Sequence, residues 1–389
     1  MPSDDLNESQ FRDLFFDKAK EYLGDLGHFN LVLFGKTGVG KSTLINAIFG
    51  VDVAQTGNGR PVTADLFEHE VDGSPLRLFD TKGFEVGESA EKLIRQMRLI
   101  IEDRRGRPVS EQVHAVWYCV RAGDRRFEDQ QAEFVEELAQ LGLPVLLVLT
   151  QVGARAKETD LELDPEALAL AENIASRSLP VVPGGRALLT NALANEWKAE
   201  PVHGLQELLD ATFRVVPEGV KAALTAAQAI DAERKKVEAT KVIRLAMAAS
   251  AAAAAVPIPF AQSAVIVPIQ AMMMARVSVV YGHSMASPVA AGLAARALLS
   301  QGVGYAAKAA VRALLTWIPG FGAGAAVVQA SVAVTFTWAV GEAWRLVCEA
   351  LMRDGQSLSD LSEAGALAEE FLKHFKGLAK QSPPEGLRP

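Results

Sequence analysis

The chain has 389 residues, a formal net charge of −8, 49% hydrophobic residues and 22% charged residues. This length predicts two or three domains with ample apolar residues for a core, and the acidic balance argues against nucleic acid as the main partner. The two cysteines, Cys119 and Cys348, fit neither a disulfide framework nor a metal site, and the acidic N-terminus does not resemble a signal peptide, so we expect a cytoplasmic protein.

Charge is unevenly distributed along the chain. Residues 241–341 contain six basic residues and no acidic ones, so the rest of the chain carries the acidic excess. We therefore expect an acidic globular part followed by an apolar, mildly basic part. The expected organisation is an N-terminal amphipathic helix at 1–27, an α/β domain at 28–220, a helical domain at 221–380 and a disordered tail at 381–389.

Apolar strand patterns alternate with helical patterns through the first half of the chain. Residues 65–71 and 76–79 form an expected strand pair through the turn at Asp72-Gly73. Further buried strands are expected at 31–34, 113–120, 144–150 and 187–190. Helices are expected at 8–26, 89–103, 127–141, 165–177 and 205–213. This alternation predicts a mostly parallel, six-stranded sheet with helices on both faces.

Residues 30–50 read NLVLFGKTGVGKSTLINAIFG, which is a strand, a glycine-rich turn and a helix from Lys41. The turn fits the spacing G-x-x-x-x-G-K-[ST] of a phosphate-binding loop. Its glycines let backbone N–H groups surround a phosphate chain, Lys41 brings positive charge to the β- and γ-phosphates, and the Ser42 hydroxyl can bind Mg²⁺. The expected nucleotide contacts are Gly35, Lys36, Thr37, Gly38, Val39, Gly40, Lys41, Ser42 and Thr43.

A second motif, Asp80-Thr81-Lys82-Gly83, follows an expected strand, as D-x-x-G does in GTPases. Asp80 would hold Mg²⁺ through water, and the Gly83 N–H would sense the γ-phosphate. Thr63, in the sequence GRPVT, is the expected switch threonine that closes on Mg²⁺ only when the γ-phosphate is present, with Thr56 as the lesser candidate. The expected metal site therefore combines Ser42, Thr63 and Asp80.

Together, GKTGVGKSTLINAIFG, GRPVT, DTKGF and HAVWYCVRAGDRR resemble the Era-like and immunity-related branch of the translation-factor-type GTPases. The segment PIPFAQSAVIVPIQAMMMARVSVVYG resembles a bacterial helical domain of unknown function that often accompanies such GTPases. The resemblance implies a Ras-like fold, GTP or GDP with Mg²⁺, and membrane association of the helical part.

The base-recognition motif departs from this family. Members carry N/T-K-x-D after the fifth strand, where the Asp binds two nitrogens of guanine, but here Thr150-Gln151-Val152-Gly153 places glycine at that position. Guanine preference therefore stays open unless Glu158 or Asp160 reaches the base, while Gln151 can still lie along it.

A last base-contacting loop is also expected from the resemblance. By position, Thr190-Asn191-Ala192 matches the family's loop, in which the Ala192 N–H would meet the base oxygen. Asn191 and Ala192 therefore join Thr150 and Gln151 in the expected base-binding set.

Phe84 follows the D-x-x-G motif where a Ras-like enzyme has its water-positioning Gln, so we expect hydrolysis to be slow or assisted. Gly38 stands where potassium-activated Era relatives carry Asn, which argues against potassium as the helper. Arg60 could act as an arginine finger in cis, although a solvated loop arginine is the favoured interpretation. An activating protein or a second copy across the nucleotide face is the more economical source of help. The expected catalytic set is Lys41, Thr63, Gly83 and Arg60.

The apolar C-terminal part contains two long uncharged stretches, 245–275 and 313–341, each interrupted by proline. Residues 260–281 number 22, about 33 Å of helix, which is enough to span a bilayer. Arg276 inside that stretch and the alanine-rich run before it favour a soluble bundle instead. Three arrangements of the C-terminal part stay open: helices that span the membrane, re-entrant or interfacial hairpins, and a soluble bundle.

The sequence thus predicts a Ras-like P-loop domain followed by an all-α hydrophobic domain. We expect a GTP-binding switch of low intrinsic GTPase rate at the inner face of the cell membrane, with membrane lipid, an activating protein or a second copy as partners. The alternatives are a nucleotide-binding membrane scaffold or pore-like protein without catalysis, and an NTPase of relaxed base choice.

Overall fold

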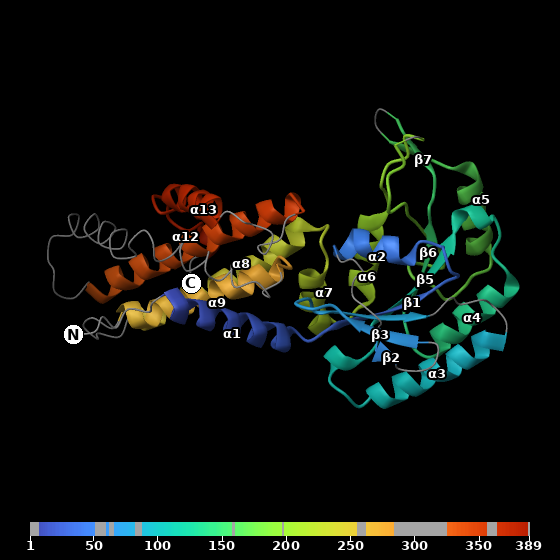
Figure 1. The fold of residues 1–389 in the computed structure, drawn as a ribbon, viewed down its shortest axis with the longest axis horizontal. Coiled ribbons are helices and arrows are strands. Elements are labelled where there is room, and N and C mark those ends of the chain that lie inside the picture. The colour runs from blue at the N-terminus through green and yellow to red at the C-terminus, as the bar shows by residue number, and fades with distance from the viewer. Residues whose placement is uncertain are drawn as a thin grey trace. The chain divides into compact units, whose positions relative to one another are not determined.

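The computed structural model divides the chain into two compact units, Leu26–Asp231 and Met1–Asp25 with Ala232–Pro389 (Figure 1). We call them the sheet unit and the helical unit. The described residues are 8–50, 60–61, 66–81, 88–157, 160–196, 198–254, 262–283, 325–355 and 364–387.

A seven-stranded sheet in the order β2-β3-β4-β1-β5-β6-β9 forms the centre of the sheet unit. Its strands are β1 (Phe29–Phe34), β2 (Arg60–Pro61), β3 (Leu66–Glu70), β4 (Leu76–Thr81), β5 (Ala115–Arg121), β6 (Val145–Thr150) and β9 (Leu188–Leu189). All pairings from β4 to β9 are parallel, whereas β2, β3 and β4 pair antiparallel. The mostly parallel sheet is confirmed. The expected count of six was one too low because the two-residue β2 is too short to show a periodic pattern.

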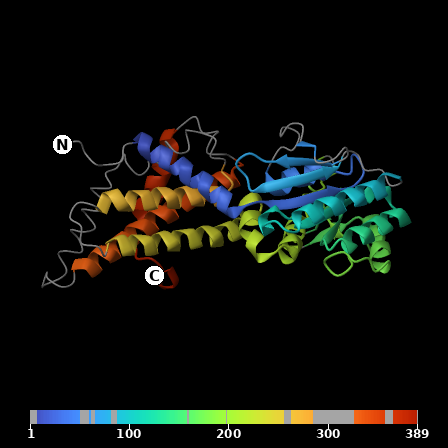
Figure 2. The ribbon, with the colours of Figure 1, turned by 90° about the horizontal axis from the view of Figure 1, so that it is seen from below.

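Helices cover both faces of this sheet (Figures 1 and 2). In β5, Val116, Tyr118 and Val120 pack among residues of three helices, which are α3 (Glu88–Arg104), α4 (Asp129–Gln140) and α5 (Pro165–Ser176). The alternate residues Trp117 and Cys119 pack on the opposite face among three others, which are α2 (Lys41–Phe49), α6 (Leu205–Val215) and α7 (Lys221–Ala227). Burial on both faces explains why the central strands are apolar almost without a break.

The sheet unit extends to Asp231, eleven residues beyond the boundary that the sequence suggested. Ala223 and Leu224 of α7 are fully buried in the same core cluster as Phe29 of β1. The Ala229 N–H also donates to the Ile48 carbonyl at 2.8 Å, which ties this segment to α2.

A separate two-stranded hairpin, β7 (Ala154–Ala156) and β8 (Leu161–Leu163), follows β6 directly. The sequence analysis did not anticipate it. Three-residue strands with exposed side chains carry neither the alternation nor the apolar run that identifies a strand.

The helical unit contains five described helices, which are α1 (Glu8–Leu26), α8 (Ala232–Ala254), α9 (Gln262–Val280), α12 (Ala325–Arg353) and α13 (Ala364–Leu378). Trp344 on α12 holds several of them together. Its ring meets Phe15 of α1 edge-on at 6.5 Å and Phe371 of α13 at 6.3 Å between centroids. Its Nε1–H donates to the Met274 carbonyl of α9 at 3.0 Å.

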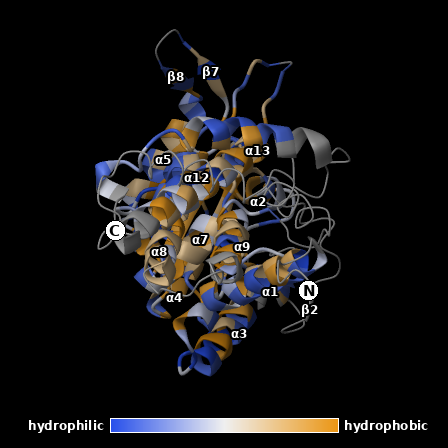
Figure 3. Ribbon diagram, turned by 90° about the vertical axis from the view of Figure 1, so that its left-hand side faces the viewer, coloured by the Kyte–Doolittle hydropathy of each residue, from blue (hydrophilic) through white to orange (hydrophobic). Residues whose placement is uncertain are grey.

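The described helices of this unit carry hydrophilic as well as hydrophobic positions (Figure 3). No helix among the described residues has the length and sustained apolar character required to cross a membrane. Residues 260 and 261, the start of the stretch considered as a span, lie outside the described part of the chain. Within α9, Gln270 is fully buried and the Arg276 guanidinium lies 5.2 Å from the centre of the Tyr22 ring.

The C-terminal tail, expected to be disordered from 381, has ordered structure up to residue 387. A short 3₁₀ turn, η4, spans Glu385–Leu387. The Arg244 guanidinium of α8 donates to the Gly386 carbonyl at 2.8 Å, so the turn is fixed to the helical unit.

Candidate nucleotide-binding site

The loop between β1 and α2 has a backbone that only glycines accommodate at three points. Gly35, Gly38 and Gly40 have φ angles of 139°, 80° and 96°, all in the region that L side chains rarely adopt. A Cβ on Gly35 would also lie 2.4 Å from the Cys119 carbonyl oxygen. The glycine spacing read from the sequence therefore reflects real conformational and steric requirements of this loop.

Lys41, the first residue of α2, reaches back across the loop. Its ammonium donates to the Gly35 carbonyl at 2.9 Å and to the Lys36 carbonyl at 3.3 Å. Ser42 and Thr43 are exposed in the first turn of the same helix. The positive helix end, the ammonium and the exposed hydroxyls lie at one place, which is the arrangement that binds phosphate oxygens.

Asp80 lies beside this loop because β4 pairs in parallel with β1. The register places Asp80 opposite Leu33, two residues before Gly35. Cys119 lies on β5, the other neighbour of β1, and burial raises the pKa of its thiol to about 12. The Asp80 carboxylate and the Ser42 hydroxyl are the oxygen donors that Mg²⁺ prefers, and the residues present therefore fit a magnesium-bound nucleotide.

The loop after β6 is hydrogen-bonded to the phosphate loop. The Thr150 hydroxyl donates to the Val39 carbonyl at 2.5 Å, and the Gln151 side-chain amide donates to the Gly38 carbonyl at 3.2 Å. Gln151 itself is in the left-handed region with φ of 55°. The two segments that the sequence assigned to base and phosphate recognition are thus in direct contact.

The loop after β9 is attached to the loop after β6 by a backbone hydrogen bond. The Val152 N–H donates to the Thr190 carbonyl at 3.0 Å, which sets Asn191 and Ala192 next to the Gln151 loop. The Asn191 side chain is used internally, because its amide donates to the Pro201 carbonyl at 2.9 Å. Contact between the Ala192 N–H and the base oxygen stays a prediction.

Several expected site residues lie outside the described part of the chain, namely Thr56, Thr63, Gly83, Phe84 and Glu158. The Arg60 backbone pairs with Glu68 in the β2–β3 ladder, but its side chain is outside the described residues. Asp160 lies beyond the last pair of the β7–β8 ladder and accepts a hydrogen bond from the Leu161 N–H at 2.8 Å. It is therefore at the far end of the hairpin from Gly153.

The sequence analysis missed two residues that shape this region. His203 shares a 3.0 Å hydrogen bond between its Nε2 and the Val152 carbonyl, so it braces the base loop. Glu200 lies directly beside Gly153. No spacing rule could identify either residue, because both are about 50 positions away from the loop that they contact.

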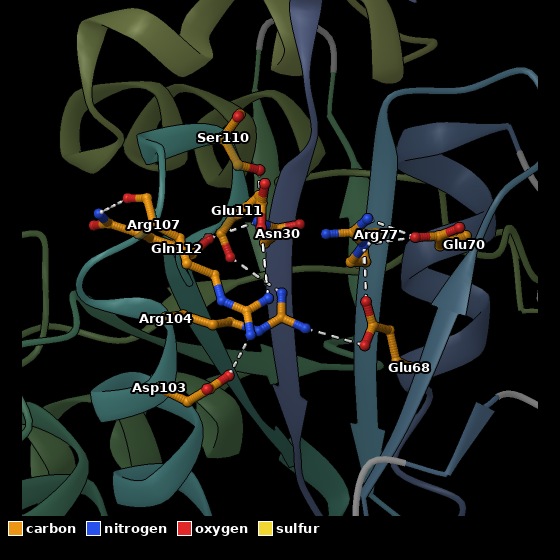
Figure 4. Close-up of polar contacts among 10 residues, drawn as sticks. All are labelled: Asn30, Glu68, Glu70, Arg77, Asp103, Arg104, Arg107, Ser110, Glu111 and Gln112. Atoms are coloured by element: carbon orange, nitrogen blue, oxygen red, sulfur yellow. Dashed lines mark hydrogen bonds and ion pairs between the residues drawn. The ribbon is translucent and has the colours of Figure 1, made fainter. Parts of the chain in front are cut away.

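A cluster of ion pairs joins the two antiparallel strands to α3 (Figure 4). Glu68 of β3 bridges the Arg77 guanidinium at 2.9 Å and the Arg104 guanidinium at 3.1 Å. Arg104 also donates to the Glu111 carbonyl at 3.1 Å and lies 4.8 Å above the Phe79 ring. The strand β3 follows the segment that contains Thr63, and the helix α3 follows the segment that contains Gly83. The ion pair between Glu68 and Arg104 therefore links the two elements that come directly after the expected switch loops.

Residues 30–151 match the 50S ribosome-binding GTPase family. The chain is 41% identical over 69 residues to GTPase Der of Ruegeria sp., covering 16% of this chain and 14% of the relative. It is 30% identical over 128 residues to GTP-binding protein A of Dictyostelium discoideum, covering 31% and 27%. A third match, 26% over 221 residues, is to GTPase Der of Parvibaculum lavamentivorans and covers 54% and 42%. The chain thus spans less than half the length of these curated relatives.

Solved structures similar to the chain include a probable GTP-binding protein engB and Era of Aquifex aeolicus. The engB structure has a TM-score of 0.33 and 17% identity, covering 48% of this chain and 97% of engB. The Era structure has a TM-score of 0.32 and 16% identity, covering 56% and 68%. Superpositions this loose establish neither fold nor activity. The segment that matches this family, residues 30–151, also contains the glycine-lined loop and Lys41.

Proposed function

We propose that this protein is a GTP-binding switch with slow or partner-assisted hydrolysis, coupled to a membrane-associated helical unit on the inner face of the cell membrane. The observation that carries the nucleotide part is the position of Lys41, whose ammonium lies across the glycine-lined loop within 3.3 Å of two of its carbonyls. When a triphosphate binds, its oxygens would replace the two carbonyls as partners of the Lys41 ammonium. Mg²⁺ would be held by Ser42, Asp80 and Thr63.

Slow hydrolysis follows from the residue at position 84. Phe84 has no group that can orient a water molecule, and Ras-like enzymes use a glutamine just after D-x-x-G for that step. The missing catalytic group would have to come from another source. The candidates are an activating protein, a second copy across the nucleotide face, and Arg60 in cis. Release of Thr63 and Gly83 after hydrolysis would be the event that the helical unit senses.

Membrane association is proposed from the composition of the helical unit. Residues 241–341 carry six basic residues and no acidic one, and the two uncharged stretches give the region a strongly apolar character. A chain segment with this balance of basic and apolar residues would be attracted to anionic lipid wherever it is exposed. Lipid is therefore the first partner to test.

The test of catalysis is phosphate release from GTP with Mg²⁺, measured with and without anionic liposomes. We expect slow turnover by the wild type and at least a tenfold loss in Ser42→Ala, because the hydroxyl is the loop's ligand for Mg²⁺. Ser176→Ala is the control, since this hydroxyl donates to the Asn173 carbonyl at the far end of α5. Equal rates in both variants would contradict the catalytic assignment, and no turnover in any condition would favour a nucleotide-binding scaffold.

A second candidate, an NTPase of relaxed base choice, is favoured by one observation. Gly153 cannot supply the carboxylate that family members use to recognise guanine. Competition between GTP and ATP for one labelled analogue distinguishes the two, because equal competition would establish the relaxed enzyme.

A further inference from the structure

The position of Gly153 relative to the phosphate loop defines where a base would lie. Gln151 is hydrogen-bonded to the Gly38 carbonyl, and the next residue, Val152, is bonded through its N–H to the Thr190 carbonyl. A base attached to phosphates in the glycine loop would therefore extend along Gln151 towards Gly153. The chemistry at position 153 decides which base edges are accepted there.

The space that a side chain at position 153 would occupy already borders a carboxylate. A Cβ built on Gly153 would lie 3.2 Å from Oε1 of Glu200 and 3.8 Å from its Cδ, with the Cβ of Asp164 at 3.7 Å. The carboxylate that the loop lacks at Gly153 is thus present at almost the same place, contributed by a segment 47 positions further along the chain.

The backbone around Glu200 is fixed on both sides. Asn195 and Glu200 exchange two backbone hydrogen bonds of 2.9 and 3.0 Å, and Asn191 and His203 exchange two of 3.0 Å. The His203 ring bonds the Val152 carbonyl at 3.0 Å, which attaches this segment to the base loop itself. Glu200 is therefore held next to Gly153 by contacts that do not involve its own side chain.

The Glu200 carboxylate is half-buried and, within the described part of the chain, has no hydrogen bond or ion pair. Asp164, whose Cβ also borders the space beside Gly153, accepts the Glu166 N–H at 3.1 Å as the N-cap of α5. A partly desolvated carboxylate without a donor is unfavourable unless a ligand supplies one. Within the described part of the chain, Glu200 is thus the carboxylate beside Gly153 that accepts no hydrogen bond.

We propose that Glu200 recognises guanine, taking the place of the aspartate that Gly153 replaces. The inference rests on the proposed nucleotide-binding function and adds its base specificity. Guanine presents two adjacent donors, N1–H and the 2-amino group, which one carboxylate accepts side by side. Adenine has an acceptor at N1 and no 2-amino group, so the same carboxylate rejects it.

The test is competition of GDP, ADP and xanthosine diphosphate against fluorescently labelled GDP, using the full chain with Mg²⁺. The wild type is expected to prefer GDP over both others by at least tenfold. In Glu200→Gln, the side chain presents one acceptor and one donor, which match the N1–H and the 2-oxo group of xanthine. We therefore expect GDP to bind at least tenfold more weakly and xanthosine diphosphate to bind more tightly than in the wild type.

Two further variants complete the experiment. Glu196→Gln removes an exposed carboxylate four positions away and should leave all three affinities as in the wild type. Gly153→Asp combined with Glu200→Ala returns the carboxylate to the loop without crowding, since the replaced side chain was the nearest neighbour of the added one. This double variant should recover the preference for GDP over xanthosine diphosphate.

Each outcome decides a separate question. An unchanged ratio of GDP to xanthosine diphosphate affinity in Glu200→Gln, or a double variant without guanine preference, would overturn the assignment of Glu200 while leaving nucleotide binding intact. A wild type that binds GDP and ADP equally would also overturn it and establish relaxed base choice. A wild type that binds no nucleotide would instead refute the proposed function.

Discussion

Gly204, at the N-terminus of α6, fits only a residue without a side chain. Its φ is 75°, and a Cβ there would lie 1.9 Å from the Leu189 carbonyl oxygen. We expect Gly204→Ala to lower the free energy of unfolding of the sheet unit by at least about 2 kcal/mol, because strain and overlap must both be relieved. Urea denaturation measures this, with Gly219→Ala as control since a Cβ there would have nothing within 4 Å. Equal midpoints for the two variants would contradict this account of the turn.

His283 makes the stability of the helical unit depend on pH. Its pKa is lowered from 6.5 to about 4, mainly by burial and also by the Lys235 charge, while the hydrogen bond to the Cys348 carbonyl acts in the opposite direction. The unfolded chain takes up a proton on this histidine more readily than the folded chain does. The stability that the neutral, buried His283 contributes is therefore fully present above pH 6.5 and is lost as the pH falls towards 4.

We expect about 3 kcal/mol of the helical unit's free energy of unfolding to be lost over that pH range through this one residue. In His283→Gln the slope of unfolding free energy against pH should be correspondingly smaller, although its stability at pH 7 will also be lower. Urea denaturation of both proteins at several pH values checks this. Parallel pH profiles would show that His283 does not titrate as its burial requires.

Single residues differ in how far the sequence could predict them. Gly35, Gly40 and Lys41 were predictable because a phosphate loop requires fixed residue types at fixed local spacing. Glu200 and His203 were not, because they reach the base loop only after the chain has passed through α5 and β9. Tertiary contacts of this kind have no period or motif in the sequence.

At the scale of elements, β3 and α3 are joined by the charge cluster around Glu68 (Figure 4). The Glu68 side chain is 15% exposed and contacts two guanidinium groups, whereas that of Glu70 on the same strand is 59% exposed. We expect Glu68→Gln to cost roughly 2 kcal/mol of unfolding free energy, because it leaves Arg104 and Arg77 partly buried without their common partner. Glu70→Gln should cost less than about 1 kcal/mol, as exposed pairs do.

Urea denaturation of the two glutamine variants provides the comparison, since they differ by two positions on one strand and remove the same charge. An equal cost for both would show that burial of the cluster does not matter. A cost confined to Glu68 would identify the cluster as the connection between β3 and α3, the elements that follow the expected switch segments.

Elements with a clear period were predictable, whereas most of the two- and three-residue strands were not, with β9 as the exception. The hairpin of β3 and β4 follows from Asp72-Gly73, whose glycine has φ of 73°, and α4 begins within two residues of the expected position. The strands β2, β7 and β8 are two or three residues long, so no alternation can develop in them. The helix α7 packs in the core cluster of the sheet unit, whereas the expected boundary lay at its first residue, because no periodic pattern shows which core a short helix joins.

At the scale of the whole molecule, the proposed coupling makes lipid binding depend on the nucleotide. We expect the full chain to float with anionic liposomes, and a non-hydrolysable GTP analogue to change the floating fraction at least twofold relative to GDP. Lys41→Ala should show the same fraction with either nucleotide, because its loop no longer distinguishes them. Equal flotation of the wild type with both nucleotides would refute the coupling, and no flotation at all would refute membrane association.

The most direct test of the central claim is a calorimetric titration of the full chain with GDP and Mg²⁺. Lys41 supplies the cation that lies across the glycine-lined loop, so the account predicts saturable binding with one site per chain and at least a hundredfold loss of affinity in Lys41→Ala. Equal affinity in the two proteins, or no binding by the wild type, would contradict it.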